Sequence, residues 1–148
     1  MAWDWQRFWK GASKLLFTEG LETETVAIQI TREEVRQYCK VIGEKNLIFY
    51  NPEAARKAGY ADVVLPATYP VLFWKDIDVP WLEEAPSIIQ SEQCFEYDEA
   101  LVANETYVCQ ITLMKVRQKG KRQFLQHVLS IKRNGKLAAT SYSTLVLV

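Results

Sequence analysis

His127 is the only histidine among 148 residues, so acid–base chemistry near neutral pH has at most one imidazole to use. Metal sites that need several imidazoles from this chain, such as a three-histidine zinc site, are therefore excluded. His127 alternates with Leu125, Leu129 and Ile131, which puts it on the apolar face of a predicted strand. We interpret it as a core residue rather than a catalyst.

The three cysteines, Cys39, Cys94 and Cys109, are odd in number and lack the paired spacing of zinc ligands. No segment near the start resembles a signal peptide, so we expect free thiols and a cytoplasmic protein. No metal and no cofactor are expected. Apolar runs stay below the ~20 residues that cross a bilayer, so no membrane span is expected. Eighteen basic and eighteen acidic residues cancel, which disfavours nucleic-acid binding.

Two short helices that would position a site have clear boundaries. The first begins at a capping box formed by Thr31 and Glu34, and it ends at Gly43. The second begins at Asn51, with proline at the first helical position, and it ends at Gly59.

A buried helix and an antiparallel sheet are predicted for the rest of the chain. The stretch from about Thr68 to Ile77 is apolar nearly all round, which is typical of a buried helix, and Thr68 can cap it. Alternating patterns then predict four long strands, at residues 91–97, 107–113, 125–131 and 136–148. Gly120 and Asn134-Gly135 mark hairpin turns. This pattern indicates an α+β hotdog fold, a curved antiparallel sheet wrapped around a central helix; a sandwich with the helix on one face is the alternative.

The run over residues 43–55, Gly-Glu-Lys-Asn-Leu-Ile-Phe-Tyr-Asn-Pro-Glu-Ala-Ala, resembles the signature of MaoC-like hydratases and dehydratases. That signature reads Gly-Asp-x-Asn-Pro-Ile-His-x-Asp. The Ala-Gly-Tyr of residues 58–60 and the Leu-Pro-Ala-Thr-Tyr-Pro of residues 65–70 are similar to elements of its N-terminal-half, or FAS1-like dehydratase, subfamily. Residues 91–97, 104–106 and 134–138 resemble later elements, so the resemblance covers the chain from about Ile30 onward.

The resemblance implies hydration of a trans-2-enoyl thioester, or the reverse loss of water from an (R)-3-hydroxyacyl thioester. In that family an Asp and a His of the motif loop handle the protons, and their positions hold Glu44 and Phe49 in this chain. A phenyl ring neither accepts nor donates a proton. Glutamate is one methylene longer than aspartate, and a displacement of ~1 Å can cost about a hundredfold in rate. Glu44 is thus the remaining catalytic candidate of a broken pair.

Five residues are candidates for substrate binding: Asn46, Phe49, Tyr50, Thr68 and Tyr69. The amide of Asn46 can contact the thioester or stabilise a turn. The backbone amides of Thr68 and Tyr69 lie at the positive end of the predicted helix, where they can bind a thioester oxygen or simply begin the helix. Tyr50 would act as an acid only after a one-residue slip of the motif.

Three functional hypotheses follow. The first is the substrate-binding subunit of a heterodimeric (R)-3-hydroxyacyl thioester dehydratase, whose partner supplies Asp and His. The second is an active homo-oligomeric enoyl-CoA hydratase that uses Glu44. The third is a non-enzymatic acyl-CoA-binding or scaffolding hotdog protein. The ligand in each case is an acyl-CoA or acyl-carrier-protein thioester.

The segments outside the motif indicate partners. Residues 1–20 predict an amphipathic helix with Trp5 and Trp9 on its apolar side, which docks on the body or a second subunit, and residues 21–148 predict a single domain. A hydrophobic strand edge at Thr140–Val148 is poorly left exposed, so we expect a homodimer or a heterodimer with a catalytic hotdog subunit.

A basic cluster flanks the predicted hairpin turn at Gly120. It consists of Arg117, Lys119, Lys121 and Arg122. It is interpreted either as a solvated turn or as a surface that meets the phosphates of coenzyme A or an acidic carrier protein.

Overall fold

The computed structural model of the chain describes residues 17–85 and 87–148. The helix predicted over residues 1–20 therefore lies outside the described residues up to residue 16, and residues 17–20 form a bend and a turn. The elements in chain order are β1 (Val26–Gln29), α2 (Arg32–Ile42), the 3-10 segment η1 (Leu47–Phe49), α3 (Pro52–Lys57), the 3-10 segments η2 (Tyr69–Asp76) and η3 (Pro80–Leu82), and β2 (Ile88–Tyr97), β3 (Thr106–Lys119), β4 (Arg122–Arg133) and β5 (Lys136–Leu147).

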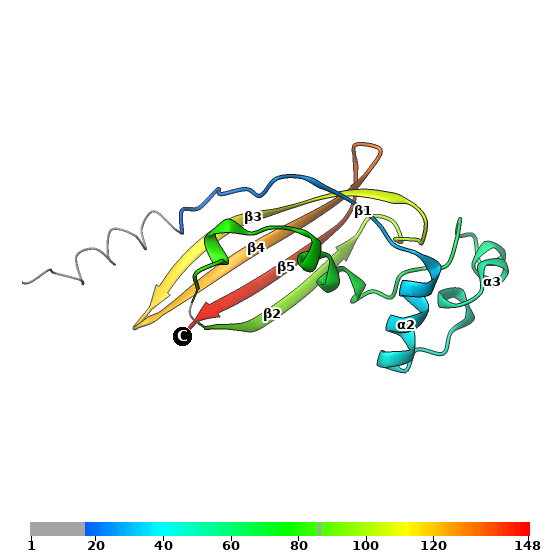
Figure 1. The fold of residues 1–148 in the computed structure, drawn as a ribbon, viewed down its shortest axis with the longest axis horizontal. Coiled ribbons are helices and arrows are strands. Elements are labelled where there is room, and N and C mark those ends of the chain that lie inside the picture. Colours follow the sequence, from blue (N-terminus) through cyan, green and yellow to red (C-terminus); the bar gives the residue numbers. More distant parts are fainter. Residues whose placement is uncertain (1–16, 86) are drawn as a thin grey trace, which may run out of the picture.

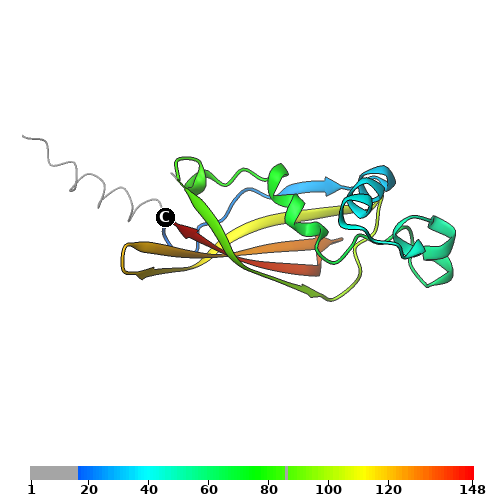
Figure 2. The same cartoon turned by 90° about the horizontal axis from the view of Figure 1, so that it is seen from below.

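The strands form one antiparallel five-stranded sheet in the order β1-β3-β4-β5-β2 (Figure 1). The segments η2 and η3 lie over one face of the sheet, whereas α2 and α3 lie at one end of it (Figure 2). This arrangement confirms the predicted hotdog fold and its four long strands. The hairpins are also confirmed, since Gly120, Asn134 and Gly135 have positive φ angles of 63°, 51° and 78°.

The core fills the space between the sheet and η2. The face of the sheet that η2 covers, called the inner face below, carries fully buried side chains from the two central strands β3 and β4: Tyr107, Ile111, Leu113, Leu125, Leu129 and Ile131. Phe73 of η2 is also fully buried in this cluster. Each such side chain stabilises the fold by about 1.5–3 kcal/mol through burial, so the sheet and η2 hold each other in place.

The two helix starts are as predicted. The Thr31 side chain accepts the amide N–H of Glu34, the Glu34 carboxylate accepts that of Thr31, and α2 ends at Gly43 with φ 73°. The Asn51 side chain accepts the amides of Glu53 and Ala54 at the start of α3.

The predicted central helix differs from the observed one. Residues 69–76 form a 3-10 helix rather than an α-helix over Thr68–Ile77, and bonds at both ends span three residues, from Val71 N to Thr68 O and from Ile77 N to Trp74 O. It is buried on one side only, because Lys75 and Asp76 are exposed. Thr68 does not cap it with its side chain.

The predicted edge strand is also wrong. The segment Thr140–Val148 belongs largely to β5, which is paired with β4 on one side and β2 on the other. Among the described residues, β1 and β2 form the two edges of the sheet. The strand β2 precedes β3 in the chain but pairs with the last strand, and no local pattern in the sequence announces that long-range pairing.

Candidate functional site

Backbone amides of the motif loop, residues 43–51, hold the Glu44 carboxylate. Glu44 Oε1 accepts the amide of Lys45 at 3.0 Å and the amide of Asn46 at 3.1 Å. Phe49, in η1, is half-buried and packs against the core. At the two positions where the resembled family has its Asp and His, this chain therefore has a carboxylate that caps a turn and a ring that adds to the core.

The other two candidates in the loop are also engaged. Asn46 Oδ1 accepts the amide of Ile48 at 3.1 Å and begins η1, which agrees with the turn-stabilising interpretation of Asn46. Its Nδ2 makes no hydrogen bond to the described residues and is exposed. The Tyr50 hydroxyl donates to the Glu44 carbonyl, and burial, with smaller effects of Cys39 and Glu44, raises its pKa. Tyr50 keeps its proton inside the loop.

Thr68 and Tyr69 differ in what they offer a ligand. The Tyr69 amide donates to the Pro66 carbonyl at 2.9 Å, so a three-residue turn already uses it, which agrees with the alternative that this amide simply begins the helix. The Thr68 amide makes no hydrogen bond within the part of the chain that the structure describes. The Thr68 hydroxyl lies 2.6 Å from the hydroxyl of Tyr38.

Helix α2 fastens the two groups of candidates to each other. The Tyr38 hydroxyl of this helix contacts the Thr68 hydroxyl. The carbonyl of the next residue, Cys39, accepts the Glu44 amide at 2.9 Å. On the far side, the Tyr97 hydroxyl of β2 donates to the Ala67 carbonyl, and burial raises the pKa of Tyr97 to about 12. The start of η2 is therefore held by neutral hydroxyl groups from two elements.

A carboxylate anchors the loop that follows α3. Asp62 accepts two hydrogen bonds of 2.9 Å from Arg32, one of 2.7 Å from the Val63 amide and one of 3.3 Å from Asn104. The bond from Arg32 is the main cause of the lowered pKa of Asp62. This cluster joins the start of α2 to the segments before η2 and β3. It therefore helps to fix α2 relative to the segment that leads to Thr68.

His127 is part of the core, as predicted. It is fully buried, its Nε2 accepts the indole N–H of Trp81 at 2.9 Å, and burial lowers its pKa to about 4. The ring of Trp74 meets it edge-on at 5.3 Å. It is therefore a neutral group enclosed by two tryptophans of η2 and η3.

A polar network on the inner face was not found from the sequence. Gln93 of β2 donates to Ser141 Oγ and accepts from Ser143 Oγ, both at 2.6 Å, and the two serines are buried. Ser143 is the register partner of both Gln93 and His127. The alternation of Ser141 and Ser143 between the apolar residues Ala139 and Leu145 is the signal for it in the sequence.

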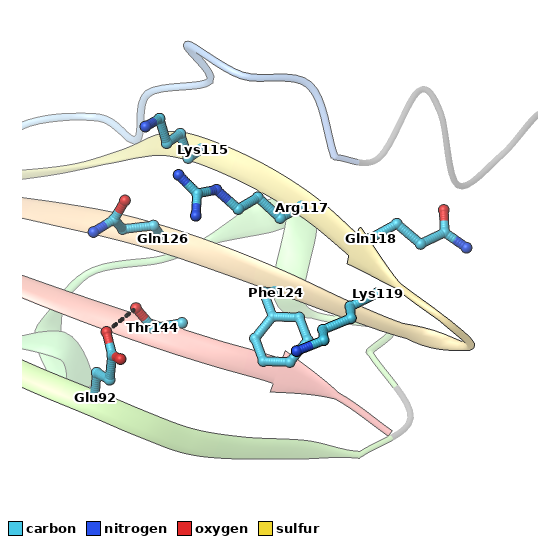
Figure 3. A pocket seen from close by; sticks show the side chains of 8 residues that line it. All are labelled: Glu92, Lys115, Arg117, Gln118, Lys119, Phe124, Gln126 and Thr144. Atoms are coloured by element: carbon cyan, nitrogen blue, oxygen red, sulfur yellow. Dashed lines mark hydrogen bonds between the residues drawn. The ribbon is translucent and has the colours of Figure 1, made fainter.

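The structure also outlines a surface depression away from the motif loop, on the opposite, outer face of the sheet (Figure 3). It is lined by Glu92, Lys115, Arg117, Gln118, Lys119, Phe124, Gln126 and Thr144. Within residues 17–85 and 87–148, no group of three or more His, Cys, Asp or Glu side chains is arranged to hold a metal. In the same residues, no helix is long and apolar enough to span a membrane.

A family profile described as the FAS1-like dehydratase domain region matches residues 18–141. The chain belongs to the FAS1-like dehydratase family. Two relatives, both called UPF0336 protein, are 30% identical over 125 residues in Clavibacter michiganensis subsp. michiganensis and 32% identical over 109 residues in a Parafrankia strain. The matches cover 80% and 70% of this chain and 84% and 72% of the relatives.

Solved structures with a fold similar to that of this FAS1-like dehydratase chain include protein complexes. A C-terminally truncated HadBC (3R-hydroxyacyl-ACP dehydratase) complex from Mycobacterium tuberculosis aligns with TM-score 0.79 and 19% identity, over 86% of this chain and 96% of that one. The ChsH1–ChsH2 complex from the same organism aligns with TM-score 0.71 and 15% identity, over 93% and 94%. A MaoC-like dehydratase gives TM-score 0.82 and 20% identity over 90% of this chain but 43% of that one. At these identities the likeness concerns the fold.

Proposed function

We propose that this FAS1-like dehydratase chain is the substrate-binding subunit of an (R)-3-hydroxyacyl thioester dehydratase. The observation that carries the proposal is the state of the motif loop. Phe49 has no titratable group, and the Glu44 carboxylate already accepts two loop amides. The buried His127, bonded to Trp81, offers no substitute.

The reaction removes the hydroxyl from C3 and a proton from C2 as water and leaves a trans-2-enoyl thioester. It needs a base for the C2 proton, an acid for the departing hydroxyl and donors for the thioester oxygen. We assign to this chain the binding of the ligand: the Thr68 amide and Asn46 Nδ2 act as donors, and Phe49 provides an apolar surface. The acid and the base come from a second hotdog protein in the cytoplasm.

The free sheet edge β2 is where the partner docks. It exposes Ile88, Ile89 and Tyr97 to the extent of 39%, 55% and 37%, which is unfavourable for an edge left in water. HadBC and ChsH1–ChsH2, which share the fold, are complexes, and this supports a two-protein assembly for this chain too.

The test is reconstitution. The purified chain should show no hydration of crotonyl-CoA or a longer enoyl-CoA, and turnover should appear on mixing with a hotdog protein encoded nearby that carries Gly-Asp-x-Asn-Pro-x-His. Strong activity of the chain alone, abolished by Glu44→Gln, would overturn the proposal in favour of a homo-oligomeric hydratase. Thioester binding with no turnover from any such partner would instead favour the non-enzymatic hypothesis.

A further inference from the structure

The outer face of the sheet carries a cluster of five cations next to the β3–β4 hairpin, and Glu92 and Glu19, which accepts the Val116 amide at 3.0 Å, are carboxylates near it. Lys115, Arg117 and Lys119 line the depression there, and Lys121 of the turn and Arg122 at the start of β4 follow. None of these five forms a salt bridge with the described residues, and no acidic residue occurs between positions 115 and 127. In a chain of zero net charge, this is a local field that favours an anion.

The strand register places four of the residues that line the depression in one row across the sheet. Lys115 of β3 is paired with Gln126 of β4, which is paired with Thr144 of β5, which is paired with Glu92 of β2. Three strand spacings of about 4.8 Å separate the ends of this row by about 14 Å. Cations thus form one wall, and a carboxylate and a hydroxyl form the opposite wall.

An aromatic ring of β4 lies beside this row, two residues nearer the hairpin than Gln126. Phe124 is the register partner of Arg117, and its half-buried ring lies among the lining side chains in Figure 3. The Glu92 carboxylate faces Thr144, whose hydroxyl donates to it at 3.4 Å, so its remaining lone pairs can accept from a hydroxyl or amino group. A ligand that fits has phosphates at one end, a planar ring in the middle and hydrogen-bond donors on the other side.

We propose that this depression binds a nucleoside phosphate, with the phosphates on Lys115, Arg117 and Lys119 and the base against Phe124. Arginine is suited to phosphate because its planar fork donates two hydrogen bonds at once. The ribose or base donors face Glu92 and Thr144. The ligand can be a free nucleotide or the nucleotide end of coenzyme A, because both present the same groups. The inference does not rest on the proposed function, since the depression lies on the face opposite η2 and at the other end of the sheet from the motif loop (Figures 1 and 3).

The test is calorimetric titration of the full chain with adenosine 3′,5′-bisphosphate, coenzyme A and inorganic pyrophosphate at low and high salt. We expect both nucleotides to bind more tightly than pyrophosphate, with affinity that falls as salt rises. Their relative affinities identify the source: tighter binding of coenzyme A points to the thioester carrier, and equal binding points to the nucleotide alone. Arg117→Gln should weaken both about tenfold.

Two further variants separate a built site from diffuse charge. Arg56 is an exposed cation of α3 without a salt bridge among the described residues, and Arg56→Gln should leave the affinity unchanged. Phe124→Leu keeps an apolar side chain and should weaken the nucleotides but not pyrophosphate. The proposal is overturned by no nucleotide binding at millimolar concentration, by equal effects of Arg56→Gln and Arg117→Gln, or by pyrophosphate binding as tightly as the nucleotides.

Discussion

The indole nitrogen of Trp81 donates a 2.9 Å hydrogen bond to His127 Nε2, and the two ring planes are nearly parallel, with an interplanar angle of 4°. An accepting Nε2 means that the neutral imidazole carries its proton on Nδ1, which is buried and makes no hydrogen bond with the described residues. The nearby Leu125 carbonyl opposes only part of the effect of burial on the pKa of His127. The single histidine of the chain thus joins η3 to the sheet.

Acidification should destabilise the folded protein through this histidine. The pKa of His127 is lowered to about 4 in the folded state, whereas an unfolded histidine titrates near 6.5. Below about pH 6.5 the unfolded chain binds a proton that the folded chain does not. The free energy of unfolding therefore decreases as the pH is lowered from about 6.5 to about 4. The total loss is on the order of 3 kcal/mol. Urea denaturation at pH 4 to 7 measures it.

A His127→Gln variant provides the control, because glutamine can still accept from Trp81 but does not titrate. The lowered pKa values of Asp62 and Glu99 cause their own acid destabilisation in both proteins, and this cancels in the comparison. The stability advantage of the wild-type chain over the variant should shrink between pH 7 and pH 4. An advantage that stays constant over this range contradicts the assignment.

The features predicted correctly are those decided by neighbouring residues. The capping box needs only Thr31 and Glu34, and a hairpin turn needs only two adjacent residues, so the sequence itself contains the cause. The signature that carries the family is local in the same sense. Alternation predicted the strands because one face of each is buried.

The features missed depend on contacts between distant segments. Thr68 was assigned to capping η2, but Tyr38, thirty positions earlier, takes its hydroxyl. The hydrogen bond from Gln93 to Ser141 joins residues 48 positions apart, and β2 pairs with the last strand. None of these pairings has a local pattern, because the fold decides which segments meet.

The Asp62 cluster should be worth more than an ordinary surface ion pair. Asp62→Ala removes the acceptor of the buried Val63 amide as well as the two bonds from Arg32. We expect the free energy of unfolding to fall by about 1–3 kcal/mol. Arg36→Ala, which breaks an exposed pair with Glu33, should change it by less than about 1 kcal/mol. Equal effects of the two variants in urea denaturation would show that Asp62 is no anchor.

The free edge β2 should control assembly. Cys94 is exposed on this strand, near its middle, so a second strand docked along the edge brings another side chain opposite it. Cys94→Arg should weaken a dimer formed through this edge, whether the docked strand is that of the catalytic hotdog protein or of a second copy, since a bulky cation then stands opposite the docked strand. Cys94→Ser is the matched control and should leave the mass unchanged in analytical ultracentrifugation. A dimer that survives Cys94→Arg with undiminished affinity places the interface elsewhere.

Asn46 offers the sharpest test of the proposed ligand site, because its two side-chain atoms have separate tasks. Oδ1 accepts the Ile48 amide and holds the loop, whereas Nδ2 is free to donate. Asn46→Asp keeps an acceptor for Ile48 but replaces the donor by a second oxygen. Because a carboxylate repels a thioester oxygen, we expect this variant to keep its melting temperature and to bind an acyl thioester about tenfold more weakly.

Asn46→Ala is the complementary variant, because it removes both the acceptor that holds the loop and the donor. It removes the acceptor, so the loop loses about 0.5–2 kcal/mol of local stability and binding weakens together with it. If Asn46→Asp binds a thioester as tightly as the wild type in calorimetry, Asn46 serves only the turn, and the ligand contact must pass to the Thr68 amide. That outcome would leave the start of η2 as the one remaining donor of the proposed site, to be tested by a Thr68→Pro variant that lacks the N–H.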